Sequence, residues 1–485
     1  MKRREFLTIS AAAATILIVG CGSNSNSGDG RGSNTQSSSD ISEVDDKNFD
    51  NVLQIPPLLE PRIVDGIKNY DLSIQEGTHS FFEGKITNTY GINGNYLGPT
   101  LRFQNADKVS INYRNTLHET TSMHGHGMHL PASMDGGPHQ QIKPTETWSA
   151  QFTVNQKACT NWYHPHLMGK TAEHVYKGLA GFIMIDDEES QSLDLPKNYG
   201  VDDIPLVLQD RFFDANYQLD YSPSMREVMM GYKGDIFITN GVINPFVEVE
   251  AKEIRFRILN GSNSTVYTLG FDDNRFFKQI ATDNSFLNAP VSLNRVRLSP
   301  AERVEIVVDL SDEINSSLHL KDFTQNKDFL KIDVTKSASI QTSTPSILTT
   351  LDIYNPDDVV NRRNFTLSGR RDDFFINDKS MDINRIDEVV PLGQVEIWEV
   401  YNSMRMEHNF HIHATHFMIL ERNGNSADVL ENEKGYKDTI YLAPGDRVKL
   451  IIKMVDYADE VNPYMYHCHF LEHEDAGMMG QFTVV

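Results

Sequence analysis

The sequence predicts an all-β protein made of three consecutive β-sandwich or β-barrel domains. Short runs of β-branched and aromatic residues alternate in polarity with period 2, as at residues 254–259 and 395–400, and Gly, Pro, Asn or Asp break these runs. Long amphipathic helical patterns are scarce. A chain of 485 residues is also long enough for about three domains.

Two short phrases recur at intervals of about 140–155 residues, which indicates three homologous units. The first phrase is Leu-Ser-Pro-Ala-Glu-Arg-Val at 298–304, Leu-Ala-Pro-Gly-Asp-Arg-Val at 442–448 and, more weakly, Lys-Pro-Thr-Glu-Thr-Trp at 143–148. The second is a turn dipeptide between strand-like runs, Asn93-Gly94, Asn240-Gly241 and Asn377-Asp378. We therefore expect domains at residues 49–190, 191–345 and 346–485.

Residues 1–21 have the form of an export signal. Arg3 and Arg4 precede an apolar run that is too short for a stable membrane span. The paired arginines resemble a twin-arginine signal, and residues 18–21 resemble a lipobox that would leave Cys21 lipidated. An ordinary cleaved signal with an incidental cysteine is the alternative. Residues 22–48 are mostly Ser, Asn, Gly and Asp and predict a flexible tether. We expect an exported, lipid-anchored protein in the periplasm or at the cell surface.

The charge and the cysteine count exclude two classes of protein. A formal net charge of −23 argues against nucleic acid as a partner, because phosphate binding needs clustered Lys and Arg. The three cysteines, Cys21, Cys159 and Cys468, are too few for a disulfide scaffold. Cys159 stands alone, and we expect it to be a small buried apolar residue.

Residues 467–478 combine imidazole, thiol and thioether groups. Two His, one Cys and a weak axial Met are the ligand set of a blue-copper electron-transfer site. Side chains alternate faces along a strand, so Cys468 points one way while His467 and His469 point the other. One strand could therefore link a single copper ion to a second metal centre. The other expected ligands of the blue site are His408, His473 and Met478.

Four His-x-His pairs occur among the 17 histidines, where random placement predicts about 0.6. Spacing i, i+2 places both rings of a pair on one face of a strand. Eight imidazoles, a ligand type that suits Zn, Cu, Fe and Ni, are too many for one ion and fit a cluster of two or three. The pairs are His124/His126, His164/His166, His411/His413 and His467/His469.

With residues 98–102 (Gly-Pro-Thr-Leu-Arg), the four pairs in order and the His-Cys-His tail, the chain resembles the multicopper oxidases. The resemblance implies three cupredoxin-like Greek-key domains, a monomer and four copper ions. Type 1 copper falls on His408, Cys468, His473 and Met478. Type 2 falls on His124 and His411, and the two type 3 ions fall on His126, His164, His166, His413, His467 and His469. All twelve residues are present, so nothing suggests the copper-free relatives that serve in cell division.

Three positions depart from the family pattern. Asn409 stands where Pro is usual, Gly125 where an aromatic residue is common, and Ala414 where Gly is usual. None of them removes a ligand. We expect them to loosen the local loops and to shift the redox potential.

The resemblance implies an oxidase mechanism. Electrons from a donor would enter type 1 copper at the edges of His408 and His473, pass from Cys468 through the backbone to its neighbours, and reduce O2 to water. Asp135 and Glu474 are the candidate proton donors. The alternative role for both is a hydrogen-bonded carboxylate that only orients a ligand, and for Asp475 we prefer that alternative.

The overall likeness is to exported cuprous oxidases of copper tolerance, so Cu(I) is the expected donor. Met404 and Met406 could hold Cu(I) beside type 1 copper, because thioether suits this ion, while Met225, Met229 and Met230 are expected to pack in the core. Residues 338–373 lack the Met- and His-rich insert of many cuprous oxidases. An open type 1 edge would instead favour phenols or aromatic amines, as in laccases. A copper-sequestering protein without turnover is a third hypothesis.

Seven further histidines lack a partner at ligand spacing and are expected to be surface or hydrogen-bonded residues: His79, His118, His129, His139, His174, His319 and His416.

Overall fold

The computed structural model describes residues 38–39, 41, 48–370 and 373–485. The expected export signal and most of the expected tether lie outside these residues. Within the same ranges, no helix has both the length and the apolar character needed to cross a membrane.

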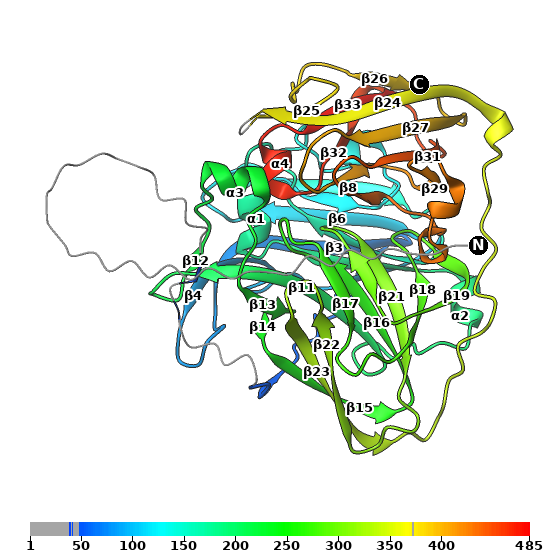
Figure 1. Ribbon diagram of the computed structural model, residues 1–485. Helices are drawn as coiled ribbons and strands as arrows, with labels where there is room; N and C mark the ends of the chain where they lie inside the picture. Colours follow the sequence, from blue (N-terminus) through cyan, green and yellow to red (C-terminus); the bar gives the residue numbers. More distant parts are fainter. Residues whose placement is uncertain (1–37, 40, 42–47, 371–372) are drawn as a thin grey trace, which may run out of the picture. The chain divides into compact units, whose positions relative to one another are not determined.

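The described strands form six sheets, and three large apolar cores each lie between two of them (Figure 1). We call these sheet pairs the first, second and third sandwich. The all-β prediction of cupredoxin-like domains is confirmed. In β3 the alternate residues Tyr70, Leu72 and Ile74 are buried, as the period-2 pattern predicts.

The first sandwich pairs a sheet of order β2-β3-β6-β8, with β4 on β3, with a sheet of order β5-β10-β9-β7. Its strands are β2 (Arg62–Val64), β3 (Ile67–His79), β4 (Thr87–Ile92), β5 (Leu101–Gln104), β6 (Lys108–Asn115), β7 (His124–His126), β8 (Thr147–Thr153), β9 (Cys159–His164) and β10 (Gly181–Asp186).

The second sandwich pairs a sheet of order β14-β13-β11-β16-β21-β18-β19 with one of order β1-β15-β23-β22-β17-β20. The short β1 (Asn51–Val52) pairs with β15 in parallel, although residue 49 was expected to begin the first domain. The other strands are β11 (Asp203–Phe213), β12 (Leu219–Asp220), β13 (Ile236–Thr239), β14 (Val242–Ile243), β15 (Pro245–Ala251), β16 (Glu253–Asn260), β17 (Tyr267–Phe271), β18 (Phe277–Ala281), β19 (Phe286–Leu293), β20 (Val296–Leu298), β21 (Arg303–Asp309), β22 (Ser316–Asp322) and β23 (Lys327–Ser337).

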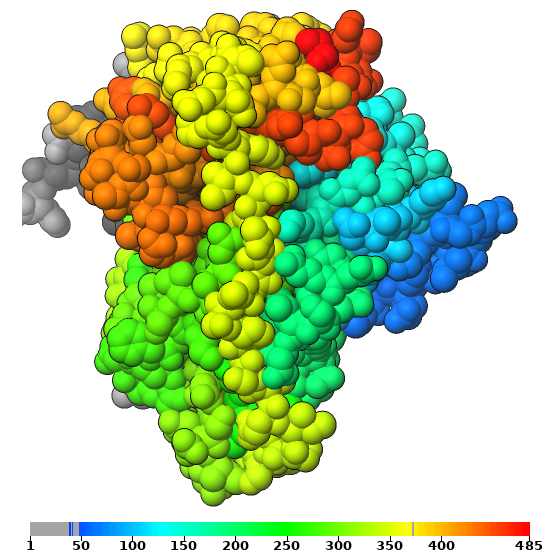
Figure 2. All heavy atoms as spheres, turned by 90° about the vertical axis from the view of Figure 1, so that its right-hand side faces the viewer, coloured from blue at the N-terminus to red at the C-terminus, as the bar shows by residue number. Residues whose placement is uncertain are grey.

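The third sandwich pairs sheets of order β25-β24-β27-β31-β29 and β26-β33-β32-β28-β30. Residues 338–358 reach it from β23 along the surface (yellow-green to yellow in Figure 2). Its strands are β24 (Val359–Arg370), β25 (Asp373–Ile376), β26 (Glu388–Val390), β27 (Val395–Asn402), β28 (His408–Ile412), β29 (Phe417–Arg422), β30 (Thr439–Leu442), β31 (Arg447–Lys453), β32 (Asp459–His467) and β33 (Met479–Val484).

Helices in the described residues are short. Both α1 and α3 pack against α4, which begins shortly after His469. The expected strand through His467, Cys468 and His469 is wrong in extent, because β32 ends at His467 and the next two residues lie beyond it. The α-helices are α1 (Thr171–Lys177), α2 (Glu188–Ser192), α3 (Met225–Met230) and α4 (Leu471–Asp475), and single 3-10 turns occupy Ala132–Met134, Pro356–Asp358, Ser426–Asp428 and Glu431–Glu433.

The recurring phrases adopt the same local structure in all three sandwiches. Asn93, Asn240 and Asn377 have φ values of 53°, 51° and 53°. Each side-chain oxygen accepts from one backbone N–H of a neighbouring strand, and each amide donates to the carbonyl two residues earlier on that strand. The residue after the proline of the other phrase also has a positive φ in each copy, at Thr145, Ala301 and Gly445.

Candidate metal centres

Two His-x-His pairs lie on the first sandwich and two on the third. Cross-strand pairing places His124 of β7 opposite His164 of β9, and His411 of β28 opposite His467 of β32. The partner of each of these histidines in its pair, two residues further along the chain, lies on the same side. All eight side chains are at most 1% exposed.

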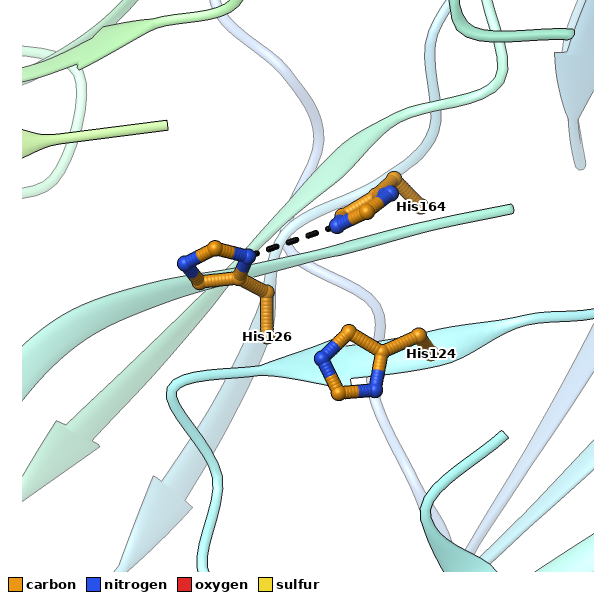
Figure 3. Close-up of side chains that lie close together, drawn as sticks. All are labelled: His124, His126 and His164. Atoms are coloured by element: carbon orange, nitrogen blue, oxygen red, sulfur yellow. Dashed lines mark hydrogen bonds between the residues drawn. The ribbon is translucent and has the colours of Figure 1, made fainter. Parts of the chain in front are cut away.

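The eight rings meet between the two sandwiches. The ring of His126 stacks on that of His411 with centroids 3.8 Å apart, and His124 stacks on His413 at 3.9 Å. Nitrogens of neighbouring rings lie 3.1 to 3.4 Å apart in the pairs His166–His467, His413–His467, His126–His164 and His164–His469. Figure 3 shows the His126–His164 approach, with His124 on the same strand as His126. The structure therefore gathers all four predicted pairs.

These imidazoles are suited to bind a metal rather than a proton. Burial lowers the pKa of all eight, and neighbouring histidines lower most of them further. For His166 and His467 the pKa falls to about 4. Neutral imidazole is the form that binds metal ions.

Unsatisfied nitrogens support the same interpretation. Among the described residues, His124 Nε2 and His411 Nε2 are buried without a hydrogen-bond partner. A buried polar atom without a partner costs free energy unless another group binds it. The donor set, which is imidazole alone at this centre, fits copper.

Asp135 and Glu474 lie behind the histidine rings. The Asp135 carboxylate accepts from His413 Nδ1 at 2.7 Å, and its backbone carbonyl accepts from His124 Nδ1 at 2.7 Å. Glu474 carboxylate oxygens lie 3.2 Å from His467 Nδ1 and 3.5 Å from His166 Nδ1. Burial raises the pKa of both carboxyl groups. Asp135 therefore orients the His413 ring, whereas the Glu474 oxygens lie near two rings without a hydrogen-bond partner among the described residues.

Sequence reasoning missed Asp438, which precedes β30. One carboxylate oxygen lies 3.1 Å from His126 Nε2, and its backbone carbonyl accepts from His411 Nδ1 at 3.0 Å. Burial alone would raise the pKa of this carboxyl group, but the Arg303 guanidinium holds it well below its usual range. No spacing pattern marks Asp438, whereas Arg303 belongs to the recurring Leu-Ser-Pro-Ala-Glu-Arg phrase.

A second cluster forms around Cys468, the first residue after β32. Cys468 Sγ lies 3.5 Å from His408 Nδ1 and 3.8 Å from His473 Nδ1, and the two nitrogens are 3.1 Å apart. Met478 is fully buried in the same core, and its carbonyl accepts from the Cys468 N–H at 3.1 Å. Burial raises the pKa of the Cys468 thiol to about 12 and lowers that of His473 to about 3. His408, Cys468 and His473 thus offer the two imidazoles and the thiol of a blue-copper site, and Met478 lies in the same core.

Comparison with known proteins identifies the family. Family profiles described as multicopper oxidase match residues 73–190 and 354–485. The multicopper oxidase mco of Staphylococcus haemolyticus is 38% identical over 423 residues, which cover 86% of this chain and 89% of the relative. The chain belongs to the multicopper oxidase family. It is therefore an oxidoreductase, and copper is the metal its centres imply.

Two further proteins are similar to this multicopper oxidase over most of its length. The solved bacterial laccase-like multicopper oxidase CueO of Ochrobactrum sp. has a TM-score of 0.83 and 36% identity, covering 89% of this chain and 100% of that one. The cell division protein FtsP of Xenorhabdus nematophila is 36% identical over 446 residues, covering 89% of this chain and 92% of the relative.

The three departures from the family pattern have local explanations. Asn409 does not loosen its loop as expected, because its side chain accepts from the His469 N–H at 2.6 Å and donates to the Pro300 carbonyl at 2.9 Å. A Cβ at Gly125 would lie 3.1 Å from Leu130 and 3.3 Å from Met128, whose side chains fill this space. Ala414 has a φ of 63°, a left-handed conformation that explains why Gly is usual there.

The expected open edge at type 1 is wrong, because both outer nitrogens are covered. His408 Nε2 lies 3.1 Å from Met404 Sδ, and His473 Nε2 lies 3.2 Å from the carbonyl of Met229 in α3. Met404 of the third sandwich thus covers His408, and α3 of the second sandwich covers His473, although residues 338–373 carry no Met- and His-rich insert.

The five methionines predicted from the sequence to lie near type 1 copper or in the core differ in burial. Met404, Met406 and Met229 are half-buried and pack against the third core. Met225 and Met230 are 62% and 48% exposed, so the expectation that they pack in the core is wrong.

The remaining predicted residues lie apart from both centres or support them indirectly. Asp475 accepts from the N–H groups of Thr171 and Ala172 at the start of α1, so it contacts no ligand ring through these bonds. Cys159 is buried, as expected. None of the seven other histidines belongs to the two clusters, although His129 Nε2 lies 3.3 Å from His416 Nδ1 between the first and third sandwiches.

Proposed function

We propose that this multicopper oxidase couples one-electron oxidation of a donor to the four-electron reduction of O2 to water. The observation that supports the proposal is the segment His467–His469 at the end of β32, whose adjacent residues belong to the two clusters. Bound copper would supply electron transfer at the cluster around Cys468 and O2 reduction at the cluster of eight histidines.

The proposed cofactor set is one type 1, one type 2 and two type 3 copper ions. Each sheet pair would be one cupredoxin-like domain, with limits near 49–190, 191–345 and 346–485. The proposed ligands are those in register with the family motifs: His408, Cys468, His473 and Met478 for type 1, His124 and His411 for type 2, and His126, His164, His166, His413, His467 and His469 for type 3.

Asp135 and Glu474 are the proposed proton donors. Both carboxyl groups are buried with a raised pKa, so they hold a proton more tightly than an exposed acid would. Their closeness to the Nδ1 atoms of His413, His467 and His166 supports a role as proton donors to the proposed O2 centre.

Cu(I) is the proposed donor, in a role in copper tolerance. The Met404 sulfur lies against His408 Nε2 and provides a soft ligand for Cu(I) there. A second thioether, on half-buried Met406, lies two residues further along the chain. The covered His473 edge disfavours direct contact with a bulky ring. The alternative is laccase-like oxidation of phenols or aromatic amines. The Ochrobactrum relative, described as active towards lignin model compounds, favours it.

We also propose that the protein acts as an exported monomer. The twin-arginine motif and the lipobox at Cys21 support export and a lipid anchor in the periplasm or at the cell surface. Globomycin-sensitive processing, read as a mobility shift that Cys21→Ser abolishes, tests the anchor.

The test of the oxidase is a spectrum and an oxygen-uptake assay of the full, copper-loaded chain. We expect an intense blue band, and oxygen uptake with Cu(I). Cys468→Ser should abolish both, while Cys159→Ser, which changes the other buried cysteine, should abolish neither. Colour without oxygen uptake on Cu(I) or a phenol would leave only copper sequestration. Uptake that is faster with a phenol than with Cu(I), and unaffected by Met404→Leu or Met406→Leu, would favour the laccase alternative.

A further inference from the structure

The recurring Leu-Ser-Pro-Ala-Glu-Arg phrase has two arginine copies in different environments. Arg447, in the third sandwich, has a side chain that is 46% exposed and pairs with Glu399. Arg303, the equivalent residue of the second sandwich, has a side chain that is 0% exposed. The shared turn therefore does not require burial of this arginine, and the buried copy needs its own explanation.

Arg303 contacts all three sandwiches. In the first, Nε donates to the Thr160 carbonyl at 2.9 Å and Nη2 donates to Asn161 Oδ1 at 2.8 Å. In the third, Nη1 and Nη2 donate to the two carboxylate oxygens of Asp438 at 2.8 and 2.6 Å. Such a two-point guanidinium–carboxylate pair fixes both the position and the plane of the carboxylate.

Asp438 in turn contacts a histidine from each side of the O2 centre. Its Oδ1 lies 3.1 Å from His126 Nε2, and its backbone carbonyl accepts from His411 Nδ1 at 3.0 Å. Both contacts require the proton on the outer nitrogen. The inner nitrogens are then free: His126 Nδ1 faces His164 Nε2 at 3.4 Å, and His411 Nε2 has no hydrogen-bond partner among the described residues.

We propose that Arg303 is a positioning residue of the metal centre, by which the second sandwich sets the orientation and the tautomer of His126 and His411 through Asp438. The inference rests on the proposed copper centre. It gives the second sandwich, which contributes none of the proposed ligands, a direct part in metal binding. Carboxylates behind metal-binding histidines act in this way in general.

A different interpretation makes Asp438 itself a ligand, since its oxygens, His126 and His411 lie within 4.8 Å of one another. The guanidinium argues against it. Arg303 nitrogens lie within 2.8 Å of both carboxylate oxygens, so a metal ion bound there would stand beside another cation.

The test compares Arg303→Lys and Asp438→Asn with a matched control, Arg257→Lys. Lysine keeps the charge of Arg303 and removes the fork, and asparagine keeps the shape of Asp438 and removes the charge. Arg257 is also buried in the second sandwich, donates to Asp203 at 2.7 and 2.9 Å and contacts Thr160 Oγ1 of the first sandwich at 3.0 Å. None of the described hydrogen bonds of Arg257 involves a histidine ring. Each full-length variant is titrated with a copper chelator, and its type 2 paramagnetic signal, blue band and copper-free melting temperature are recorded.

We expect both test variants to release the copper bound by His126 and His411 at a chelator concentration about 10- to 100-fold lower than the wild type requires. Their type 2 signal should change, and their blue band should not. The control should match the wild type in copper release, while its copper-free melting temperature falls at least as far as theirs. The inference is overturned if Arg303→Lys retains copper and the type 2 signal like the wild type, or if Arg257→Lys loses them equally. A wild-type protein that binds copper only at Cys468 would instead overturn the proposed function.

Discussion

Asn409 allows a quantitative test of how the Cys468 strand is held. Its side chain is fully buried, accepts from the His469 N–H at 2.6 Å and donates to the Pro300 carbonyl at 2.9 Å. Asn409→Ala leaves both backbone groups without these partners. A buried polar group without a partner costs about 1 to 3 kcal/mol, so the two together predict a loss of about 2 to 6 kcal/mol in unfolding free energy.

The assay is urea unfolding of the copper-free protein, followed by tryptophan fluorescence. Asn112→Ala is the control, because Asn112 also makes two side-chain hydrogen bonds, to Asp71 and Ser149, but lies in β6 where water reaches its partners. We expect the control to lose less than about 1 kcal/mol. Equal urea midpoints for the two variants at an unchanged slope would refute the reasoning, because burial would then not matter.

Three further predictions concern strain, protons and the donor. Ala414→Gly should raise the unfolding free energy by about 1 kcal/mol, because glycine adopts the left-handed φ of 63° without strain. The control, Ala150→Gly in β8, should lower the unfolding free energy. A lower unfolding free energy for both variants in urea would contradict this. Burial lowers the pKa of His166 and His467 from 6.5 to about 4, so the unfolded chain binds protons more tightly than the folded chain. The unfolding free energy of the copper-free protein should therefore fall as pH falls from about 6.5 to about 4, by up to about 1.4 kcal/mol per pH unit for each histidine. A urea midpoint that is constant over this range would be incompatible with neutral buried imidazoles. Met404→Leu should lower kcat/KM for Cu(I) about 10-fold, or about 1.4 kcal/mol, and leave phenol oxidation within about 2-fold; equal losses for both donors in oxygen-uptake kinetics would indicate a general effect on type 1.

The candidate metal-binding residues were accessible to sequence reasoning because their spacing is local. Spacing i, i+2 predicts two rings on one side of an extended segment. The eight paired histidines do meet in one cluster, although β9, β28 and β32 each end before the second histidine of the pair. The turns at Asn93, Asn240 and Asn377 were likewise visible, since asparagine tolerates the left-handed conformation of a tight turn. The hydrogen bonds of their side chains to a neighbouring strand were not visible.

Other parts of the site depend on how the sandwiches dock, which no local pattern records. Asp438 is one of many acidic residues, and its role follows only from Arg303, 135 residues away in the chain. The cover on His473 comes from the Met229 carbonyl, which any residue type could supply. Ala414 and Asn409 were visible as departures, but their effects depend on a backbone angle and on the second sandwich.

The stacked pairs His126–His411 and His124–His413 also constrain the order of events during synthesis. Four of the twelve proposed ligands, which are half of the eight paired histidines, lie at or before residue 166, whereas the other eight lie between residues 408 and 478. A nascent chain therefore carries half a metal centre while the whole second sandwich is made. Closing so long a loop costs entropy that the finished contacts must offset. If these histidines bind copper as proposed, copper loading must follow synthesis of the third sandwich, and the bound copper would tie the first sandwich to the third.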